Sequence, residues 1–470
     1  MNLFHIAWRN LQHRWLASWL TLLSMALGVA LVVLVLAISG LIQETFRRNS
    51  NVGYNLVVGP KGSPLQLTLS SVFYLSKPVG TLPYRYYLEY LPKPAREQAY
   101  RQLGGSPEEG ARNGSYGMFV GNGFALPICL GDYVGPFRIV ATTVDYLGQL
   151  RHGPDNDRTF EFAQGRNFQE DSQEHGFFEA VVGSIVAKEM NFKLGDVIYP
   201  SHGPDGESHG DGFTIVGILE PTGTPTDRVA LINIEGFYLL EGHVAPERDE
   251  ETGLEKATKP AGDLQARQAD QQVDPPANSK AGRKRLPLDQ REVSAILLKT
   301  AGFVGIGLQQ QINKSSRAQA VSPIGEIAGL LETFFQPAQW ALLALTVLVC
   351  LVSAISILVS IYNSMHERTR DIAVMRALGA GRNTVLLVIL AEALLISVGG
   401  GLLGWTIGHA IAAAASPVVE ARTGIRVGFW SMNSVAEPFI IPGLVVIGIL
   451  AGLLPALMAY RTDVSRSLAS

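Results

Sequence analysis

The sequence predicts a membrane protein with four transmembrane helices and one large α+β extracytoplasmic domain between the first and second helices. Only 17% of its 470 residues are charged, against about 25% in an average soluble protein. The shortfall is concentrated in four apolar runs, each long enough for the ~20 residues that cross the hydrocarbon core of a bilayer. We predict spans at 15–43, 333–363, 383–414 and 438–460.

The first two apolar runs are longer than a bilayer requires. A helix of about 29 residues extends about 43 Å, whereas the hydrocarbon core is about 30 Å thick. We therefore expect both helices to continue out of the bilayer as a stalk beneath the domain that connects them.

The arginines near the ends of the spans predict the orientation of the chain, because positive charges are enriched in cytoplasmic loops. More of them lie before the first span, between the second and third, and after the fourth than on the opposite side. The two sets are Arg9, Arg14, Arg368, Arg370, Arg376, Arg382, Arg461 and Arg466, against Arg47, Arg48, Arg422 and Arg426. We therefore predict a bacterial inner-membrane protein with cytoplasmic N- and C-termini, including a tail at 461–470. The domain 44–332 and the loop 415–437 then lie outside the cytoplasm.

The segment 44–332 mixes strand-like, helix-like and turn-like stretches without a strict βαβ alternation, which favours an α+β domain. The strand-like stretches are Asn55–Val58, Phe137–Thr143, Ala180–Val182, Phe213–Leu219 and Val293–Lys299, and the helix-like ones are Ser184–Asn191 and Gly305–Asn313. From about 242 to 291 the sequence is charged, rich in Gln and Pro, and almost free of large apolar residues. This composition predicts a disordered insertion.

Residues 1–14 predict an amphipathic helix on the inner membrane surface. Its apolar face is formed by Leu3, Phe4, Ile6, Ala7 and Leu11. The alternative is that this stretch is an irregular start of the first span.

The sequence contains no recognisable catalytic motif. The P-loop pattern G-x-x-x-x-G-K-[ST] is absent, so we expect no ATP binding by a P-loop in this sequence. The net charge of −3 does not suggest nucleic-acid binding, and a disulfide between Cys129 and Cys350 is not expected. The loop around His202, Asp205, His209 and Asp211 has side chains that can bind a metal. Such Gly/Asp/Ser/His loops are more often plain turns, so we predict no metal site and no enzymatic activity.

Two features of the third span are unusual. Gly400, Gly404 and Gly408 form a stripe of small residues that allows another helix to approach closely. We predict that this stripe packs within the helix bundle, with a moving interface as the alternative. Glu392 is an acid inside the apolar run, and such an acid usually faces the protein interior. A structural hydrogen bond and a role in transport both remain open for it.

The loop between the second and third spans, residues 364–382, predicts a short amphipathic helix that faces the cytoplasm. Ile372, Met375 and Leu378 fall near one face, and Gly379 and Gly381 can end the helix. The charged residues around that face are Glu367, Arg368, Arg370, Asp371 and Arg376. The periodicity alone does not decide whether the helix lies on lipid headgroups or docks into a partner protein.

The segment Glu367–Ala380 (E-R-x-R-D-I-A-V-M-R-A-L-G-A) resembles the cytoplasmic loop of the FtsX/MacB-type ABC permeases. Asp371 and Ala373 stand where that family usually has Glu and Gly. Other segments resemble the family's N-terminal helix, outer domain, approach to the second span and closing segment. These are Ala7–Leu11, Val181–Ile198, Phe213–Ile232, Ala318–Leu331 and Pro455–Arg461. The resemblance does not cover residues from about 60 to 130 or the insertion.

The resemblance implies a permease dimer, of identical or different chains, that works with two cytoplasmic ABC ATPase subunits. ATP would be bound by those partner subunits, and this chain would bind no cofactor. The site residues Glu367, Arg368, Arg370, Asp371, Ile372, Met375, Arg376, Leu378 and Gly379 would contact the ATPase. The first two spans would carry its motion to a MacB-like periplasmic core domain at 44–332, a scheme called mechanotransmission.

Three functions remain open after the resemblance. The first is a permease for export or for lipid and lipoprotein extraction, in contact with membrane lipids and with a periplasmic adaptor. The second is an FtsX-like regulatory coupler that controls an envelope hydrolase or senses a peptide. The third is an autonomous membrane receptor without an ATPase. The substrate is not specified by any of these features.

Overall fold

The computed structural model describes most of the chain and divides it into two compact units. The described residues are 3–50, 53–153, 156–203, 206, 208–243, 282–367, 376, 379–423 and 437–461. The helical unit comprises Met1–Thr45 and Leu331–Ser470, and the sheet unit comprises Phe46–Leu330.

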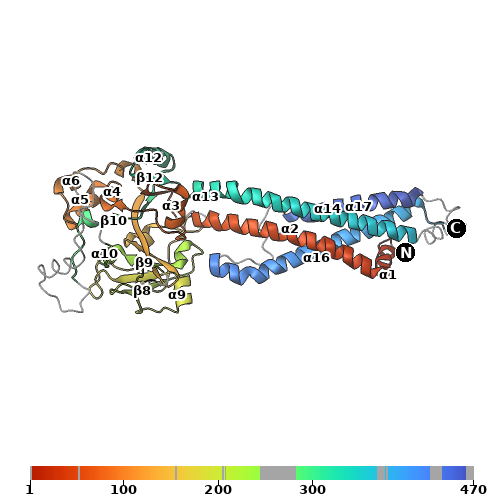
Figure 1. Ribbon diagram of the computed structural model, residues 1–470, viewed down its shortest axis with the longest axis horizontal. Helices are drawn as coiled ribbons and strands as arrows, with labels where there is room; N and C mark the ends of the chain where they lie inside the picture. Colours follow the sequence, from red (N-terminus) through yellow and green to blue (C-terminus); the bar gives the residue numbers. More distant parts are fainter. Residues whose placement is uncertain are drawn as a thin grey trace. The chain divides into compact units, whose positions relative to one another are not determined.

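Among the described residues, the helical unit contains a short first helix and four long ones, all labelled in Figure 1. They are α1 (Leu3–His13), α2 (Trp15–Ser50), α14 (Gln336–Glu367), α16 (Arg382–Thr423) and α17 (Ile440–Arg461). Long apolar runs form these helices because, in lipid, a helix satisfies its own backbone hydrogen bonds. Candidate spans cover Trp15–Ile42, Pro323–Ser364, Arg382–Val418 and Glu437–Met458. The chain is therefore a multi-pass membrane protein with four spans.

Two helix boundaries bear on the sequence predictions. The third span continues as α16 to Thr423, past the predicted end at 414. The expected excess length of the first two spans is present, because α2 has 36 residues and helical structure before α14 begins at Pro323. That these helices form a stalk stays a prediction.

The core of the helical unit is built from all four long helices. Its buried members are Met25, Val29 and Val33 from α2, Ile357 and Ile361 from α14, Val385, Ile389, Ala393 and Ile396 from α16, and Leu444, Ala451 and Ala456 from α17. The amphipathic helix α1 packs against this core through half-buried Leu11. Its Ala7 is also buried, whereas Trp8 is exposed. The predicted apolar face of α1 thus contacts protein at Leu11 and Ala7.

The sheet unit is an α+β domain, as the sequence predicts. It is built on a ten-stranded mixed sheet. The order is β12-β1-β11-β3-β4-β9-β6-β8-β5, with β7 paired to β8. The strands are β1 (Leu56–Pro60), β3 (Phe124–Val134), β4 (Phe137–Thr142), β5 (Phe162–Gly165), β6 (Glu179–Val182), β7 (Val197–Ile198), β8 (Phe213–Leu219), β9 (Val229–Asn233), β11 (Ala295–Lys299) and β12 (Ala318–Val321). The β4–β9 and β6–β8 pairs are parallel and the others antiparallel.

The helices of the sheet unit are mostly short. They are α3 (Pro64–Ser71), α4 (Tyr84–Leu88), α5 (Lys93–Gln102), α6 (Pro107–Ala111), α7 (Gly117–Val120), α8 (Asp145–Gln149), α9 (Ser184–Met190), α10 (Ile234–Tyr238), α12 (Gly302–Lys314) and α13 (Pro323–Leu330). A separate two-stranded sheet pairs β2 (Leu82–Pro83) with β10 (Glu292–Val293). All five strand-like stretches and both helix-like stretches of the sequence correspond to such elements.

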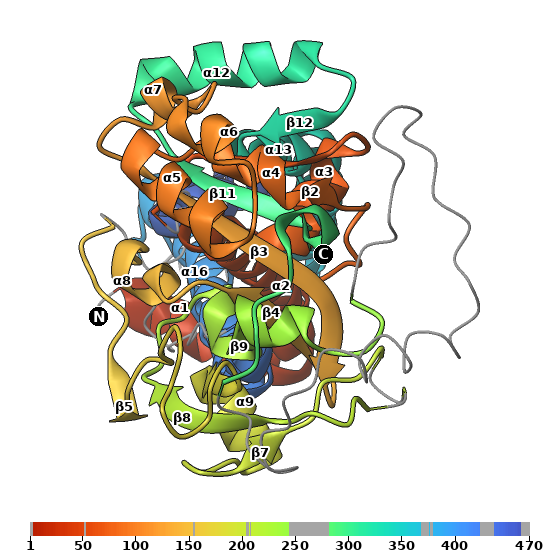
Figure 2. The same ribbon diagram turned by 90° about the vertical axis from the view of Figure 1, so that its left-hand side faces the viewer.

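The long strand β3 connects the antiparallel and mixed parts of the sheet, and Figure 2 shows it as a curved strand between β11 and β4. Its pairing with β4 shifts register between Leu130 and Tyr133. Gly131 and Asp132 therefore lie in a β-bulge, a feature that re-aims side chains.

The predicted extent of the disordered insertion, 242–291, is wrong at its C-terminal end. Residues 244–281 lie outside the described part of the chain, whereas residues 282–291 are described. Arg291 is 1% exposed, and its guanidinium donates to both carboxylate oxygens of Glu235 at 2.9 and 2.5 Å. Composition alone marks this stretch as polar. The charge of Arg291, however, is neutralised by Glu235, which lies 56 residues earlier in the chain.

Candidate functional site

Most of the predicted ATPase-coupling segment lies outside the described residues. This applies to Arg368, Arg370, Asp371, Ile372, Met375 and Leu378. On its flanks, α14 ends at Glu367 and α16 begins at Arg382. Gly379 has φ +102°, and its N–H donates to the carbonyl of Arg376 at 3.1 Å. This conformation favours glycine, so a turn separates Arg376 from α16. The coupling role of the segment stays a prediction.

The glycine stripe of α16 lies directly against α2. A Cβ added at Gly400 would lie 2.9 Å from the Leu22 carbonyl oxygen, and one at Gly408 would lie 2.8 Å from the Val33 Cβ. At Gly404 it would clash with the Ala26 carbonyl oxygen. Small residues thus bring the two helix backbones together, as in close helix pairs in membranes. The stripe packs α16 against α2 inside the helical unit.

The membrane spans contain two buried acids. Glu392 on α16 is 7% exposed, so its carboxylate is enclosed by the helical unit. Glu437, at the start of the fourth span, accepts a hydrogen bond from Trp405 Nε1 at 3.1 Å and pairs with His409 Nε2. Sequence reasoning missed the Glu437–His409 pair. The sequence signal for this pair is that two ionisable residues lie within or beside apolar runs. Ionisable residues within a membrane are usually functional.

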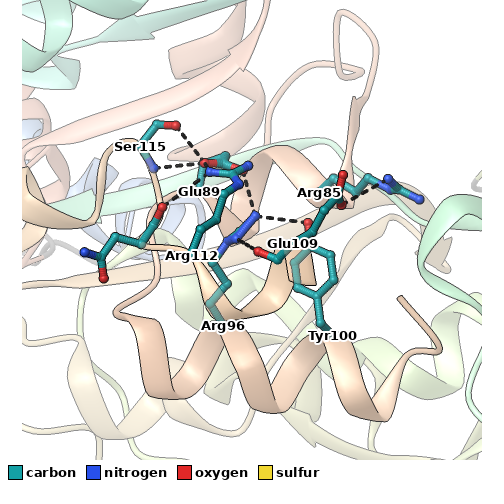
Figure 3. A network of polar contacts seen from close by, with 8 residues as sticks. Arg85, Glu89, Arg96, Tyr100, Glu109, Arg112 and Ser115 are labelled. Atoms are coloured by element: carbon teal, nitrogen blue, oxygen red, sulfur yellow. Dashed lines mark hydrogen bonds and ion pairs between the residues drawn. The ribbon is translucent and has the colours of Figure 1, made fainter. Parts of the chain in front are cut away.

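A network of charged residues holds together the short helices α4, α5 and α6 of the sheet unit (Figure 3). Arg96 is fully buried and donates to Glu89 at 3.0 Å, to the Tyr100 hydroxyl at 3.1 Å and to the Glu109 carbonyl at 2.7 Å. Arg112 makes two further hydrogen bonds to Glu89. Charges buried to this degree are stable when paired and hydrogen-bonded. This network lies in the 60–130 region that the motif resemblance did not cover.

The network lowers the pKa of Glu89. Burial by itself raises the pKa of this carboxyl, but hydrogen bonds from Arg112 and Ser115 and the charge of Arg96 outweigh it. Glu179, which accepts two hydrogen bonds from Arg166 at 2.9 and 2.7 Å, has a lowered pKa for the same opposing reasons. A carboxyl with a lowered folded-state pKa stabilises the protein above its unfolded pKa, and this contribution is lost as pH falls through the folded pKa.

We expect the sheet unit to become less stable as the pH falls below about 4.5, the ordinary pKa of a glutamate, toward the lowered pKa values of Glu89 and Glu179. The urea midpoint, followed by the near-ultraviolet circular dichroism of the tyrosines around Glu89, measures this effect. Glu89→Gln should show a smaller decrease than the wild type, because the titrating group is gone. Glu97→Gln is the control, since Glu97 pairs with Arg101 at the surface. A decrease in Glu89→Gln as large as in the wild type would contradict the prediction.

The polar loop with two histidines is more than a set of turns. His202 and His209 lie beside Asp132 of β3 and His243, which follows α10. Asp211 instead pairs with Arg283 at 2.8 Å, and Asp205 lies outside the described residues. Burial, followed by the neighbouring His243 and His202, lowers the pKa of His209, although Asp132 opposes the shift. Asp132 and His243 were missed because no local spacing connects them to the loop.

Comparison with known proteins identifies both units. Residues 18–281 match the model of the MacB-like periplasmic core domain, and residues 343–464 match that of the FtsX-like permease C-terminal domain. The first match includes residues 60–130. The two matched ranges together cover the sheet unit up to residue 281 and most of the helical unit.

Several curated export proteins are similar to this chain. The macrolide export ATP-binding/permease protein MacB of Bdellovibrio bacteriovorus is 25% identical over 305 residues, which are 63% of this chain and 39% of that protein. MacB of Bordetella avium is 34% identical over 145 residues, 29% of this chain and 21% of the relative. The probable syringafactin export ATP-binding/permease protein SyfD of Pseudomonas syringae pv. tomato is 29% identical over 202 residues, 41% of this chain and 29% of the relative.

The chain spans less than two fifths of the length of these relatives. The assignment therefore comes from the family models and not from any one relative. Because the match to the MacB-like periplasmic core domain covers more than half of the chain, and the match to the FtsX-like permease domain covers most of its last three long helices, the chain belongs to the MacB/FtsX-type permeases of ABC transporters.

Proposed function

We propose that this permease couples a cytoplasmic ABC ATPase to its sheet unit, for export or for lipid or lipoprotein extraction, without carrying substrate through a membrane pore. The ATPase hydrolyses ATP, and this chain transmits the motion. The observation that carries the proposal is the contact of the α16 glycine stripe with α2. Where two helix backbones are in direct contact, few side chains lie between them that could change conformation when one helix moves. A movement at the start of α16 is therefore passed to α2.

The connections of the sheet unit suit this role. The chain enters the sheet from α2 at β1 and leaves it through β12 toward α14. β1 and β12 are hydrogen-bonded neighbours, with Val57 opposite Val321 and Val58 opposite Ala320. The two spans therefore join adjacent strands at one edge of the sheet. A relative displacement of α2 and α14 would act on that edge first.

The remaining partners follow from the membrane setting. In the proposal the loop 364–382 and both termini face the cytoplasm of a bacterial inner membrane, where the ATPase is available. A second permease chain completes the assembly. Exposed apolar residues such as Leu16, Leu20 and Leu27 on α2, and Leu348 and Ile355 on α14, are available to lipid or to that second chain. A periplasmic adaptor would receive the cargo.

The test is a pull-down of the detergent-solubilised protein from its native membrane, with ATPase activity and subunit stoichiometry measured in the eluate. We expect a co-purifying P-loop ATPase, and we expect Ile372→Asp with Met375→Asp to reduce its recovery at least about tenfold. Each tenfold loss corresponds to about 1.4 kcal/mol, a modest cost for placing a charge in an apolar groove.

The matched control places the same charges on the opposite face of the predicted helix. Ala373→Asp with Ala377→Asp meets this requirement, because these positions lie roughly opposite Ile372 and Met375 at about 100° per residue. This variant should retain the ATPase. An eluate without ATPase from the wild type would contradict the coupling proposal and favour an autonomous receptor. Equal loss in both double variants would show that the apolar face is not the docking surface.

A further inference from the structure

Four potential metal ligands converge in the sheet unit. Asp132, His202, His209 and His243 each offer one ligand atom, and these atoms all lie within 4.8 Å of one another. The carboxylate of Asp132 lies 3.4 Å from His202 Nδ1, 3.5 Å from His209 Nε2 and 3.2 Å from His243 Nε2. His209 Nε2 and His243 Nε2 are 3.2 Å apart.

The carboxylate of Asp132 faces the three histidines and has no hydrogen-bond partner among the described residues. The Asp132 side chain is fully buried. A buried carboxylate is costly unless it is paired or binds a metal. The β-bulge of β3 aims this side chain out of the regular ladder, toward the three imidazole rings.

The histidines are held in place by backbone hydrogen bonds and by a ring contact. Ser201, next to His202, exchanges hydrogen bonds with Tyr133 of β3 at 2.9 and 3.0 Å, and the His209 N–H donates to the Pro200 carbonyl at 2.8 Å. His243 follows α10, and its ring packs on Phe237 with 4.3 Å between the centroids. The cluster is thus positioned by β3, by the loop between β7 and β8, and by the end of α10.

The spacing of the four groups is close to that of a tetrahedral metal site. Zn²⁺ binds histidine nitrogen at about 2.0–2.1 Å, so two ligands at the tetrahedral angle lie about 3.3–3.4 Å apart. The His209 and His243 nitrogens lie 3.5 and 3.2 Å from Asp132 Oδ2 and 3.2 Å from each other, and His202 Nδ1 lies 3.4 Å from Asp132 Oδ1. All four ligand atoms lie within 4.8 Å of one another. A site with three imidazole ligands does not suit Ca²⁺ or Mg²⁺, because these ions bind oxygen ligands.

We propose that Asp132, His202, His209 and His243 bind one divalent transition-metal ion, with Zn²⁺ as the ion that the donor set and spacing fit best. Four protein ligands complete a tetrahedral shell, as in structural zinc sites. The ion therefore joins three segments of the sheet unit instead of presenting an open position to a substrate. Ions enter from the solvent side, where the His202 side chain is 58% exposed, while those of His209 and His243 are 5% and 11% exposed.

The experiment measures metal binding to the full chain in detergent, without a polyhistidine tag and after dialysis against a chelator. Titration with Zn²⁺ in competition with a chromophoric chelator should give one ion per chain with a Kd below about 1 μM. Co²⁺ should produce the visible absorption of a tetrahedral site. His202→Gln and His243→Gln should each weaken binding by at least about 100-fold. That is the upper end of the loss caused by removing a group that only orients a metal ligand.

Two controls separate ligation from general effects on the loop. Asp211→Asn lies in the same loop but pairs with Arg283, and His175→Gln removes a histidine outside the cluster. Both should bind Zn²⁺ like the wild type. Zn²⁺ should also raise the thermal midpoint of the wild type, as expected for a ligand of the folded state, and this rise should vanish in His202→Gln. Because His202 is mostly exposed, that variant should still fold.

The proposal fails on either of two results. The wild type could bind less than about a tenth of an ion per chain at about 100 μM free Zn²⁺, far above the Kd expected of a structural site. Alternatively, His202→Gln and His243→Gln could bind Zn²⁺ as tightly as the wild type, which would place the ion elsewhere. Neither result bears on ATPase coupling, which is measured separately.

Discussion

Replacing Gly404 with alanine should destabilise the helical unit by about 3 kcal/mol, the upper end of the range for overpacked cores. The added methyl group would clash with the Ala26 carbonyl oxygen and lie 2.8 Å from the Val29 Cβ. Backbone atoms cannot rotate away as a flexible side chain can, so α16 and α2 must separate. Because this contact also carries the proposed coupling, ATPase stimulation by the permease should fall with stability.

The native cysteines allow each unit to be measured separately. Cys350 lies in α14 beside α2, and its sulfur would be 3.4 Å from a Cβ added at Gly28. It therefore reports the helical unit in a Cys129→Ser background. Its alkylation by a fluorogenic maleimide during heating gives the unfolding midpoint. Gly404→Ala should lower this midpoint by several degrees.

Gly443→Ala on α17 is the matched control for Gly404→Ala. A Cβ at Gly443 would meet no heavy atom within 4 Å, and alanine stabilises a helix interior by roughly 0.5–1 kcal/mol relative to glycine. The two substitutions should therefore have opposite signs. If Gly404→Ala melts at or above the wild-type temperature, α16 and α2 are not packed as closely as described.

Replacing Arg291 with alanine should destabilise the sheet unit by about 3–5 kcal/mol, the cost of leaving one member of a buried ion pair alone. Arg291 is 1% exposed and Glu235 is 7% exposed. The guanidinium also donates to the Leu286 carbonyl at 2.7 Å and lies 4.9 Å from the centre of the Tyr238 ring. Removing it leaves the Glu235 carboxylate buried without its cation.

Cys129 reports this effect in a Cys350→Ser background. It is buried next to Tyr238, and its sulfur lies 3.3 Å from the Glu292 carbonyl oxygen. Burial raises the pKa of its thiol to about 12, so the folded protein should react slowly with maleimide. Arg291→Ala should expose Cys129 at a lower temperature or a lower urea concentration.

Two further variants test the origin of the Arg291 effect. Arg283→Ala breaks the partly exposed pair with Asp211 and should cost no more than about 1 kcal/mol. Arg291→Met combined with Glu235→Leu removes both charges and should recover most of the lost stability, as buried pairs replaced by apolar residues often do. Equal costs for Arg291→Ala and Arg283→Ala would contradict the prediction.

The membrane spans and the principal strands could be predicted because each is determined within its own segment. An apolar run of ~20 residues has few alternatives to a transmembrane helix, and strands rich in β-branched residues have a local pattern. The stretches Phe137–Thr143 and Phe213–Leu219 were recognised in this way and correspond to β4 and β8. Their order in the sheet was not predicted, because strand pairing depends on residues far apart in the chain.

In the candidate sites, too, local features could be predicted from the sequence, whereas contacts between distant residues could not. The sequence by itself determined that Gly400, Gly404 and Gly408 share a face for close packing, since three residues at a spacing of four align on any helix. Only the tertiary structure showed that this face meets α2. In the same way, composition marked Arg291 as part of a polar insertion, whereas the fold pairs it with Glu235.

The histidine cluster shows most clearly what could not be predicted from the sequence. The loop with His202 and His209 was visible in the sequence as a set of polar turns. Asp132, however, lies about 70 residues before this loop, and His243 lies beyond the next two strands and α10. What the sequence determined by itself was local: apolar length, strand pattern and helix periodicity. Which charged side chains meet was decided by the tertiary structure, because electrostatic and coordinating contacts depend on distance in space and carry no periodicity along the chain.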